Sequence, residues 1–79
     1  MKNKGHKMQN DKWALQVKGL LKAELKKQNI SHDELSAKLA KIGIKESAQN
    51  LNNKINRAKF SAVFLLQCLK AIDVNKVEL

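Results

Sequence analysis

The sequence has no proline and no tyrosine, and among its 79 residues it has one cysteine and three glycines. So few turn-forming residues disfavour a turn-rich all-β fold. One cysteine excludes an intramolecular disulfide bond and a cysteine-based zinc site. The longest apolar run is five residues, Ala62 to Leu66, which is too short to span a membrane. The basic N-terminus lacks the apolar stretch of a secretory signal. These absences predict an all-α, cytoplasmic domain.

The chain also lacks the side-chain combinations on which catalysis depends. Its two histidines, His6 and His32, are isolated and give no metal-ligand spacing. Cys68 lies within an apolar stretch, which predicts a buried core side chain and not a nucleophile. We therefore expect no enzyme activity, no cofactor, no metal, no small-molecule substrate and no membrane binding.

Positive charge is the feature that the chain has in excess. Sixteen Lys and Arg face seven Asp and Glu, for a formal net charge of +9. The excess lies in residues 1–60, because residues 61–79 sum to zero. This balance predicts an anionic partner. Residues 1–10 lack periodicity and are predicted to form a flexible basic arm, which either contacts nucleic acid or is merely solvated. Residues 11–79 are predicted to form one helical domain.

Apolar spacing and capping residues predict helices over 11–28 and from Ser31 to Ile42. The second helix begins with a capping box formed by Ser31 and Glu34, and Gly43 ends it. Leu15 falls on the polar side of the first helix, and Trp13 is expected to cover the core and not to stack on a base. One apolar face of the first helix carries Trp13, Ala14, Val17, Leu20, Leu21 and Leu25.

Two further helices are predicted from Ser47 to Arg57 and from Ser61 onward, and the last residues are left open as a further turn. In the third helix the apolar residues form one narrow stripe, and most of the other positions carry amide or cationic side chains. Asparagine is a poor helix former, so its abundance indicates a surface selected for what it contacts. The fourth helix is apolar almost all round, which predicts a central, buried helix with Lys70 as the exposed exception.

A short amphipathic helix, a glycine turn and a polar-faced helix together fit a helix-turn-helix unit, whose second helix enters the major groove of DNA. Amide side chains can pair with adenine and arginine with guanine, which makes the base-reading candidates Gln49, Asn50, Asn53 and Arg57. Phosphate contacts position a protein without reading sequence, and the candidates for them are Lys38, Lys41, Lys45, Ser47, Lys54 and Lys59, with Lys4 and Lys7 of the arm.

Residues 30–74 resemble the Cro/lambda-repressor-like helix-turn-helix family, most closely in the run from Leu51 to Val74. The chain is also similar to an uncharacterised bacterial helix-turn-helix domain family in Trp13, Gly43-Ile44, Asn50-Leu51, Lys54-Ile55-Asn56-Arg57 and Phe60-Ser61. The resemblance implies a compact four- to five-helix fold and a regulator of transcription that binds double-stranded DNA, commonly as a dimer, at the bacterial or phage nucleoid. The chain departs from it in a longer connection after the second helix and in Asn56-Arg57-Ala58 where many members have Glu-Arg-Gly.

Two alternatives stay open beside DNA binding. The same fold can serve as a protein-interaction module that binds an acidic partner, with the asparagine-rich face as its interface. RNA is disfavoured, because three aromatic residues offer few stacking platforms for single strands. A homodimer is also left open, with a patch formed by Leu15, Val74, Val77 and Leu79.

Overall fold

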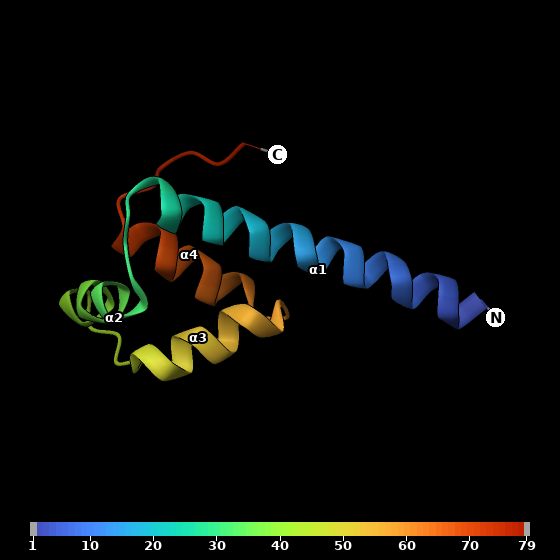
Figure 1. Ribbon diagram of the computed structural model, residues 1–79, viewed down its shortest axis with the longest axis horizontal. Coiled ribbons are helices and arrows are strands. Elements are labelled where there is room, and N and C mark those ends of the chain that lie inside the picture. Colours follow the sequence, from blue (N-terminus) through green and yellow to red (C-terminus); the bar gives the residue numbers. More distant parts are fainter. Residues whose placement is uncertain (1, 79) are drawn as a thin grey trace.

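Four helices make up the fold: α1 (Lys2–Lys27), α2 (His32–Lys41), α3 (Ala48–Arg57) and α4 (Ala62–Ala71). The computed structural model describes the backbone of residues 2–78 and the side chains of residues 11–78. Helices α2, α3 and α4 cluster against the C-terminal half of α1, whose N-terminal half extends beyond the cluster (Figure 1). No strand and no fifth helix occur over residues 2–78. The prediction of an all-helical domain is confirmed.

Helix α1 begins at Lys2 instead of Asp11. The backbone of residues 2–10 thus continues the helix and does not form a separate irregular segment. The segment has no proline, and its one glycine, Gly5, disfavours a helix by only about 1 kcal/mol. Nothing in the sequence therefore stops the helix at residue 11. The side chains of Lys4 and Lys7 lie outside the described residues, so their contact with DNA, like the flexibility of the arm, stays a prediction.

Serine caps the N-terminus of each of the other three helices. The hydroxyls of Ser31, Ser47 and Ser61 accept a hydrogen bond from the backbone N–H three residues on, at 3.0–3.2 Å. The backbone N–H of Ser31 also donates to the Glu34 carboxylate at 3.1 Å, which completes the predicted capping box. Each such cap stabilises its helix by about 1 kcal/mol. All three predicted helix starts are confirmed.

The C-terminal ends of α1, α2 and α4 share one arrangement. In each, a residue with positive φ follows the helix, and the next residue donates its N–H to the carbonyl five positions earlier. This is the Schellman motif, in which an apolar residue after the turn packs back on the helix. The left-handed residues are Asn29, Gly43 and Asp73, and the apolar residues after them are Ile30, Ile44 and Val74. The predicted stop at Gly43 is confirmed.

The hydrophobic core takes side chains from all four helices. Helix α1 contributes Leu21 and Leu25, Ile72 directly follows α4, and the rest come from α2, α3 and α4, of which α2 packs against both α3 and α4. Cys68 is fully buried, as expected. At the edge of the core, the Gln28 amide donates to the carbonyl of Ile72 at 2.9 Å, which ties the end of α1 to the end of α4. The other core members are Leu35, Leu39, Leu51, Ile55, Phe64, Leu69 and Ile72.

Two predictions about burial are wrong. Helix α4 is not buried all round, because Val63 and Leu66 are 64% and 69% exposed. In the described part of the chain no element covers this outer face. Trp13 does not cover the core but is 66% exposed. It lies eight residues before Leu21, or about 12 Å along the helix axis, where α1 has already passed the edge of the core.

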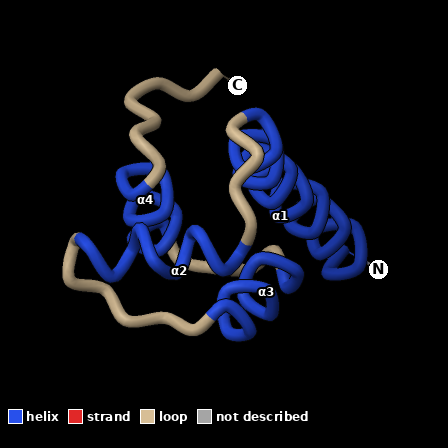
Figure 2. Tube along the Cα trace, turned by 60° about the vertical axis from the view of Figure 1, so that its left-hand side comes forward, coloured by secondary structure: helices blue, strands red, loops and turns tan. Residues whose placement is uncertain are grey.

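The proposed dimer residues are not all equally available. Leu15 is 62% exposed and Val77 is 44% exposed. Val74 is instead half-buried against the core. Beyond it the chain runs back toward the C-terminal end of α1 without regular structure (Figures 1 and 2). Leu79 lies outside the described residues, and dimerisation stays a prediction.

Candidate nucleic-acid interface

Two buried side chains and one hydroxyl fix the position of α3. Leu51 and Ile55 are completely buried and hold one face of the helix against the core. Residues 42–47 connect α2 to α3 and are secured by Ser36, whose hydroxyl donates to the carbonyl of Glu46 at 2.5 Å. Because the inner face of α3 and the connection that leads into it are both held, the core sets the direction in which α3 presents its outer side chains.

The four base-reading candidates of the sequence all lie on the exposed side of α3. Gln49, Asn50, Asn53 and Arg57 are each exposed, and at 3.6 residues per turn the four fall within a sector of about 100° on one face of the helix. None of the four hydrogen-bonds through its side chain to another side chain described in the structure. Their donors and acceptors are therefore available to a ligand without first breaking an internal bond.

The remaining asparagines of α3 behave differently. The side-chain amide of Asn56 donates to the side-chain oxygen of Asn52 at 3.0 Å, so these two side chains are hydrogen-bonded to each other. The Asn56 carbonyl accepts from the Lys18 ammonium of α1 at 3.2 Å. A lysine at this position suits the negative end of the α3 dipole. Sequence reasoning had not assigned a role to Lys18, since only the packing of α1 against α3 brings the two together.

Lys54, a predicted phosphate ligand, has internal partners. Its ammonium forms an ion pair with the Glu46 carboxylate and lies 4.9 Å from the centre of the Phe64 ring. These contacts join the α2–α3 connection to α3 and α4. Lys59 is also paired, with Asp11 at 3.4 Å, but both side chains are more than half exposed. Exposed pairs contribute less than about 1 kcal/mol, so a phosphate could replace Asp11 easily.

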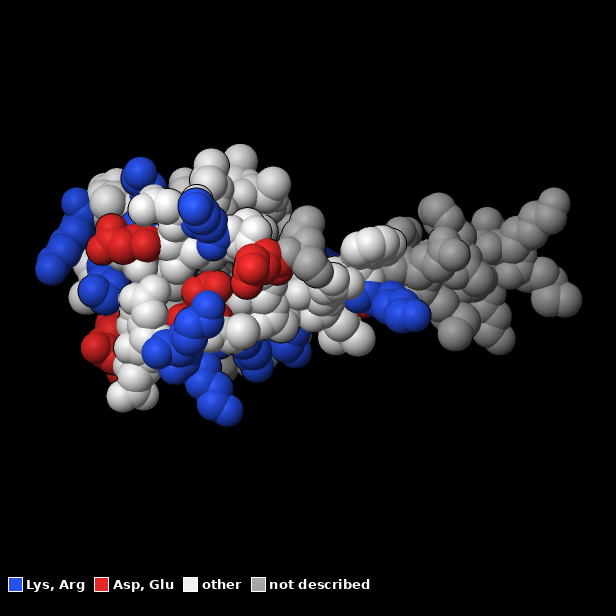
Figure 3. All heavy atoms as spheres, turned by 90° about the horizontal axis from the view of Figure 1, so that it is seen from above, with Lys and Arg blue, Asp and Glu red and all other residues white. Residues whose placement is uncertain are grey.

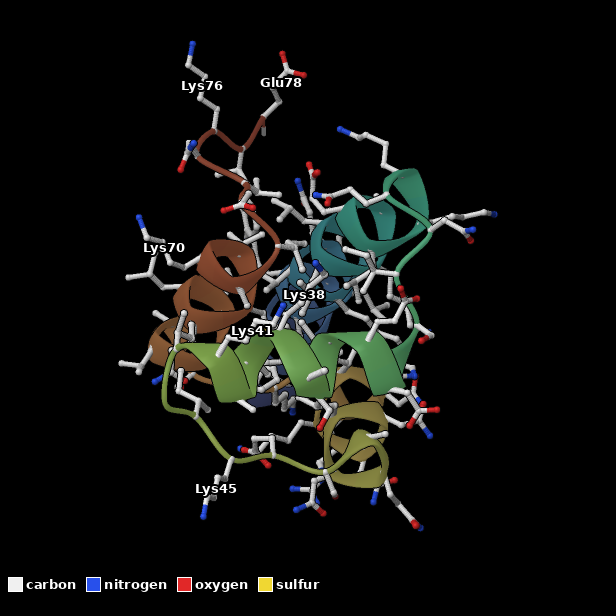
Figure 4. All side chains as sticks on the ribbon, turned by 90° about the vertical axis from the view of Figure 1, so that its left-hand side faces the viewer. Lys38, Lys41, Lys45, Lys70, Lys76 and Glu78 are labelled. Atoms are coloured by element: carbon white, nitrogen blue, oxygen red, sulfur yellow. The ribbon has the colours of Figure 1, made fainter. Side chains whose placement is uncertain are left out.

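The lysines of α2 and its connection differ in direction. Figure 4 shows Lys45 pointing to the side of the molecule on which α3 lies, whereas Lys70 and Lys76 point away from it. Lys38 and Lys41 rise from the edge of α2 that faces away from α3. Seen from the α1 side, basic side chains are interspersed with acidic ones and with uncharged surface (Figure 3). Lys45 and the cap residue Ser47 lie two residues apart, at the N-terminal end of α3.

The structure also bears on metal binding, on membrane-spanning helices and on the reactivity of the cysteine. Among residues 11–78, no three His, Cys, Asp or Glu side chains gather as they would around a metal ion. No helix in the part that the structure describes combines the length and the apolar character needed to cross a membrane. Cys68, the one thiol, is sealed in the core, and its burial raises its pKa from 9.0 to about 11.

Fold and surface together define a small all-helical domain that presents an amide-rich helix on one face. Residues 13–77 match a protein family described as a domain of unknown function, DUF6471. Because this match spans most of the chain, the protein belongs to that family. Comparison with curated proteins and with solved structures finds no match in either.

Proposed function

We propose that this protein is a small DNA-binding protein, a transcriptional regulator that inserts α3 into the major groove of double-stranded DNA. The observation that carries the proposal is the exposed face of α3, where Gln49, Asn50, Asn53 and Arg57 form no side-chain hydrogen bond to any described residue, opposite a buried apolar stripe. The major groove admits one α-helix. A helix held by its opposite face can enter it without unfolding any part of the core.

The residue types on this face suit base recognition. Asparagine and glutamine pair with the N6 and N7 atoms of adenine, and arginine pairs with O6 and N7 of guanine. Each good bidentate pair discriminates against the wrong base by about 1–3 kcal/mol. Asn50, Asn53 and Arg57 follow one another at intervals of three and four residues. They therefore reach successive positions along a groove that runs beside the helix.

Cations at both ends of α3 would hold the helix in register. Lys45 and Ser47 precede the helix, and Lys59 follows it. Ten residues of helix span about 15 Å, so these groups can meet phosphates on either side of one groove. Lys38 and Lys41 lie on the side of α2 away from α3 (Figure 4), so they stand apart from this set of phosphate candidates. Lys54 holds α3 in position in this arrangement and does not bind a phosphate, because its ammonium is already paired with Glu46.

A selection experiment combined with a salt titration tests this function. Binders are selected from random duplex DNA, and the affinity of the selected duplex is then measured over a range of salt concentrations. We expect a defined site, and a logarithm of affinity that falls by about 0.9 per phosphate contact for each unit of log salt. A palindrome with half-sites about one helical turn apart would indicate the dimer. No enriched site and an affinity insensitive to salt would overturn the proposal and favour the protein-interaction alternative.

A further inference from the structure

A groove with two lobes adjoins the C-terminal end of α3. Its apolar lobe has a volume of about 430 Å³, lies between α1 and the loop after α3, and has Trp13, Ala14 and Val17 along one side. Its cationic lobe, of about 220 Å³, is lined by Lys54 and Arg57, together with Ser61 and Phe64. Lys59 and Phe60 line both lobes, so the two hollows adjoin each other at these residues. We name this surface the Trp13 groove.

The apolar lobe leaves a large aromatic surface in contact with water. Trp13 is 66% exposed, although burying a large side chain stabilises by about 1.5–3 kcal/mol. Phe60 beside it is half-buried, and its ring packs edge-on against Phe64 at a centroid distance of 5.2 Å. The contact with Phe64 thus fixes the Phe60 ring, which forms one apolar side of the lobe. An apolar side chain placed here would cover Trp13 and gain contact with Val17 and Phe60 together.

The charged side chains that line the groove are all positive, although Lys54 is also paired with Glu46. Three cations line it, namely Lys54, Arg57 and Lys59, and no carboxylate occurs among its described lining residues. Asp11 reaches the rim through its ion pair with Lys59, but that pair is exposed to solvent. A ligand that brings carboxylates can therefore take the place of Asp11. The cationic lobe favours an anionic ligand, while the apolar lobe favours an apolar one.

We propose that the Trp13 groove binds an acidic segment of a partner protein. An aromatic or branched aliphatic side chain of the segment lies over Trp13, and carboxylates before or after it pair with Lys59 and Arg57. Duplex DNA fits this surface less well, because its backbone supplies phosphates for the cations and nothing for the apolar lobe. The inference goes beyond DNA binding and does not rest on it. Since Arg57 is also a base-reading candidate, a bound segment and a duplex would compete for it.

Peptide selection tests the groove directly. A phage-displayed library of random dodecapeptides is selected on the immobilised full-length protein. We expect a consensus with at least two acidic residues next to one large apolar residue. Binding of the selected peptide is then followed by the fluorescence of Trp13, the one tryptophan of the chain. We expect the emission to shift to the blue and quenching by acrylamide to decrease as the peptide covers the ring.

Two variants of the groove and one control locate the binding site. Ala14→Glu places a carboxylate in the apolar lobe, and Leu15→Glu adds the same charge at an exposed residue outside the groove. Lys59→Glu reverses the charge at the rim without touching helix packing, so it gives an answer even if Ala14→Glu unfolds. We expect each groove variant to weaken the peptide by about tenfold or more, a change of about 1.4 kcal/mol, and Leu15→Glu to change the affinity less than about twofold.

Several outcomes would overturn the proposal. One is the absence of any enriched peptide, and another is a consensus that lacks either acidic or apolar residues. A peptide equally affected by Leu15→Glu would bind elsewhere. If a selected DNA duplex protected Trp13 from acrylamide as well as the peptide did, the groove would belong to the DNA surface. Asn50→Ala, which tests base reading on α3, should leave the peptide affinity unchanged, so the two proposals can fail separately.

Discussion

The ammonium nitrogen of Lys54 lies 4.9 Å from the centre of the Phe64 ring. The same ammonium is paired with the Glu46 carboxylate, whose side chain is only 16% exposed. One lysine thus connects the α2–α3 connection, α3 itself and the first turn of α4. These contacts indicate that Lys54 helps to fix the orientation of α3. The other lysines of this lysine-rich chain are not marked as different from it by the sequence.

Lys54→Met should therefore lower the stability of the fold. The variant loses the cation–π contact and leaves Glu46 without its partner, for an expected loss of about 1–2 kcal/mol in the free energy of unfolding. Urea denaturation measures the loss. Lys45→Ala is the matched control, because Lys45 is exposed, and it should change stability by less than about 0.5 kcal/mol. Equal losses in the two variants would show that the contacts of Lys54 contribute nothing.

Asn50→Ala and Asn52→Ala form a matched pair for DNA recognition. Asn50 stands on the free face of α3, whereas Asn52 is bonded to Asn56. We expect Asn50→Ala to reduce affinity for the selected duplex by about 1–3 kcal/mol and to relax preference at one base pair, with a much smaller effect of Asn52→Ala. Competition binding with single-base variants of the site measures both. If Asn52→Ala had the larger effect, the reading face would have been assigned to the wrong side of the helix.

Lys45→Ala and Lys70→Ala should separate phosphate contact from overall charge. Each removes one positive charge, but Lys45 points to the α3 side and Lys70 away from it (Figure 4). Lys45→Ala should weaken all duplexes alike and reduce the number of phosphate contacts inferred from the salt slope by about one. Lys70→Ala should leave the slope unchanged. The same reduction in both variants would mean that net charge, and not a local contact, governs binding.

Ala58→Gly should stabilise the protein. Ala58 ends α3 in the left-handed conformation, with φ of 64°, which disfavours any residue with a Cβ by about 1–2 kcal/mol. Glycine avoids this strain but loses a buried methyl group and has a more flexible unfolded chain. We expect a net gain of up to about 1 kcal/mol in thermal unfolding. Ala40→Gly, at an exposed position within α2, should instead destabilise by about 1 kcal/mol.

Burial also governs the titration of Cys68. Desolvation raises the pKa of its thiol from 9.0 to about 11. Between these values the unfolded chain loses the thiol proton while the folded chain retains it, so the stabilisation that this group contributes is complete below pH 9 and declines as the pH rises toward 11. Chemical denaturation at pH 8 and pH 10.5 measures the decline. Cys68→Ala should show a smaller decline, and an identical pH dependence would contradict the raised pKa.

Much of the local structure could be predicted from short stretches of sequence. The serine caps at positions 31, 47 and 61 act through hydrogen bonds that span three residues, and Gly43 ends α2 by bonds to the turn just before it. The exposed face of α3 also followed from spacing alone. Its apolar residues are few and lie in one narrow stripe, so a single arrangement buries Leu51 and Ile55.

Tertiary structure decided the properties that depend on a distant neighbour. Whether Trp13 is covered depends on where α1 leaves the core. Whether Leu66 is covered depends on whether another element packs against the outer face of α4. Lys54 and Lys59 carry the same charge in the sequence. In the structure, Lys54 forms a half-buried ion pair with Glu46, whereas Lys59 forms an exposed ion pair with Asp11. Hydrogen bonds between near neighbours along the chain therefore set the helix boundaries. Burial and charge pairing became definite only when four helices met, because each depends on surfaces far apart in the sequence.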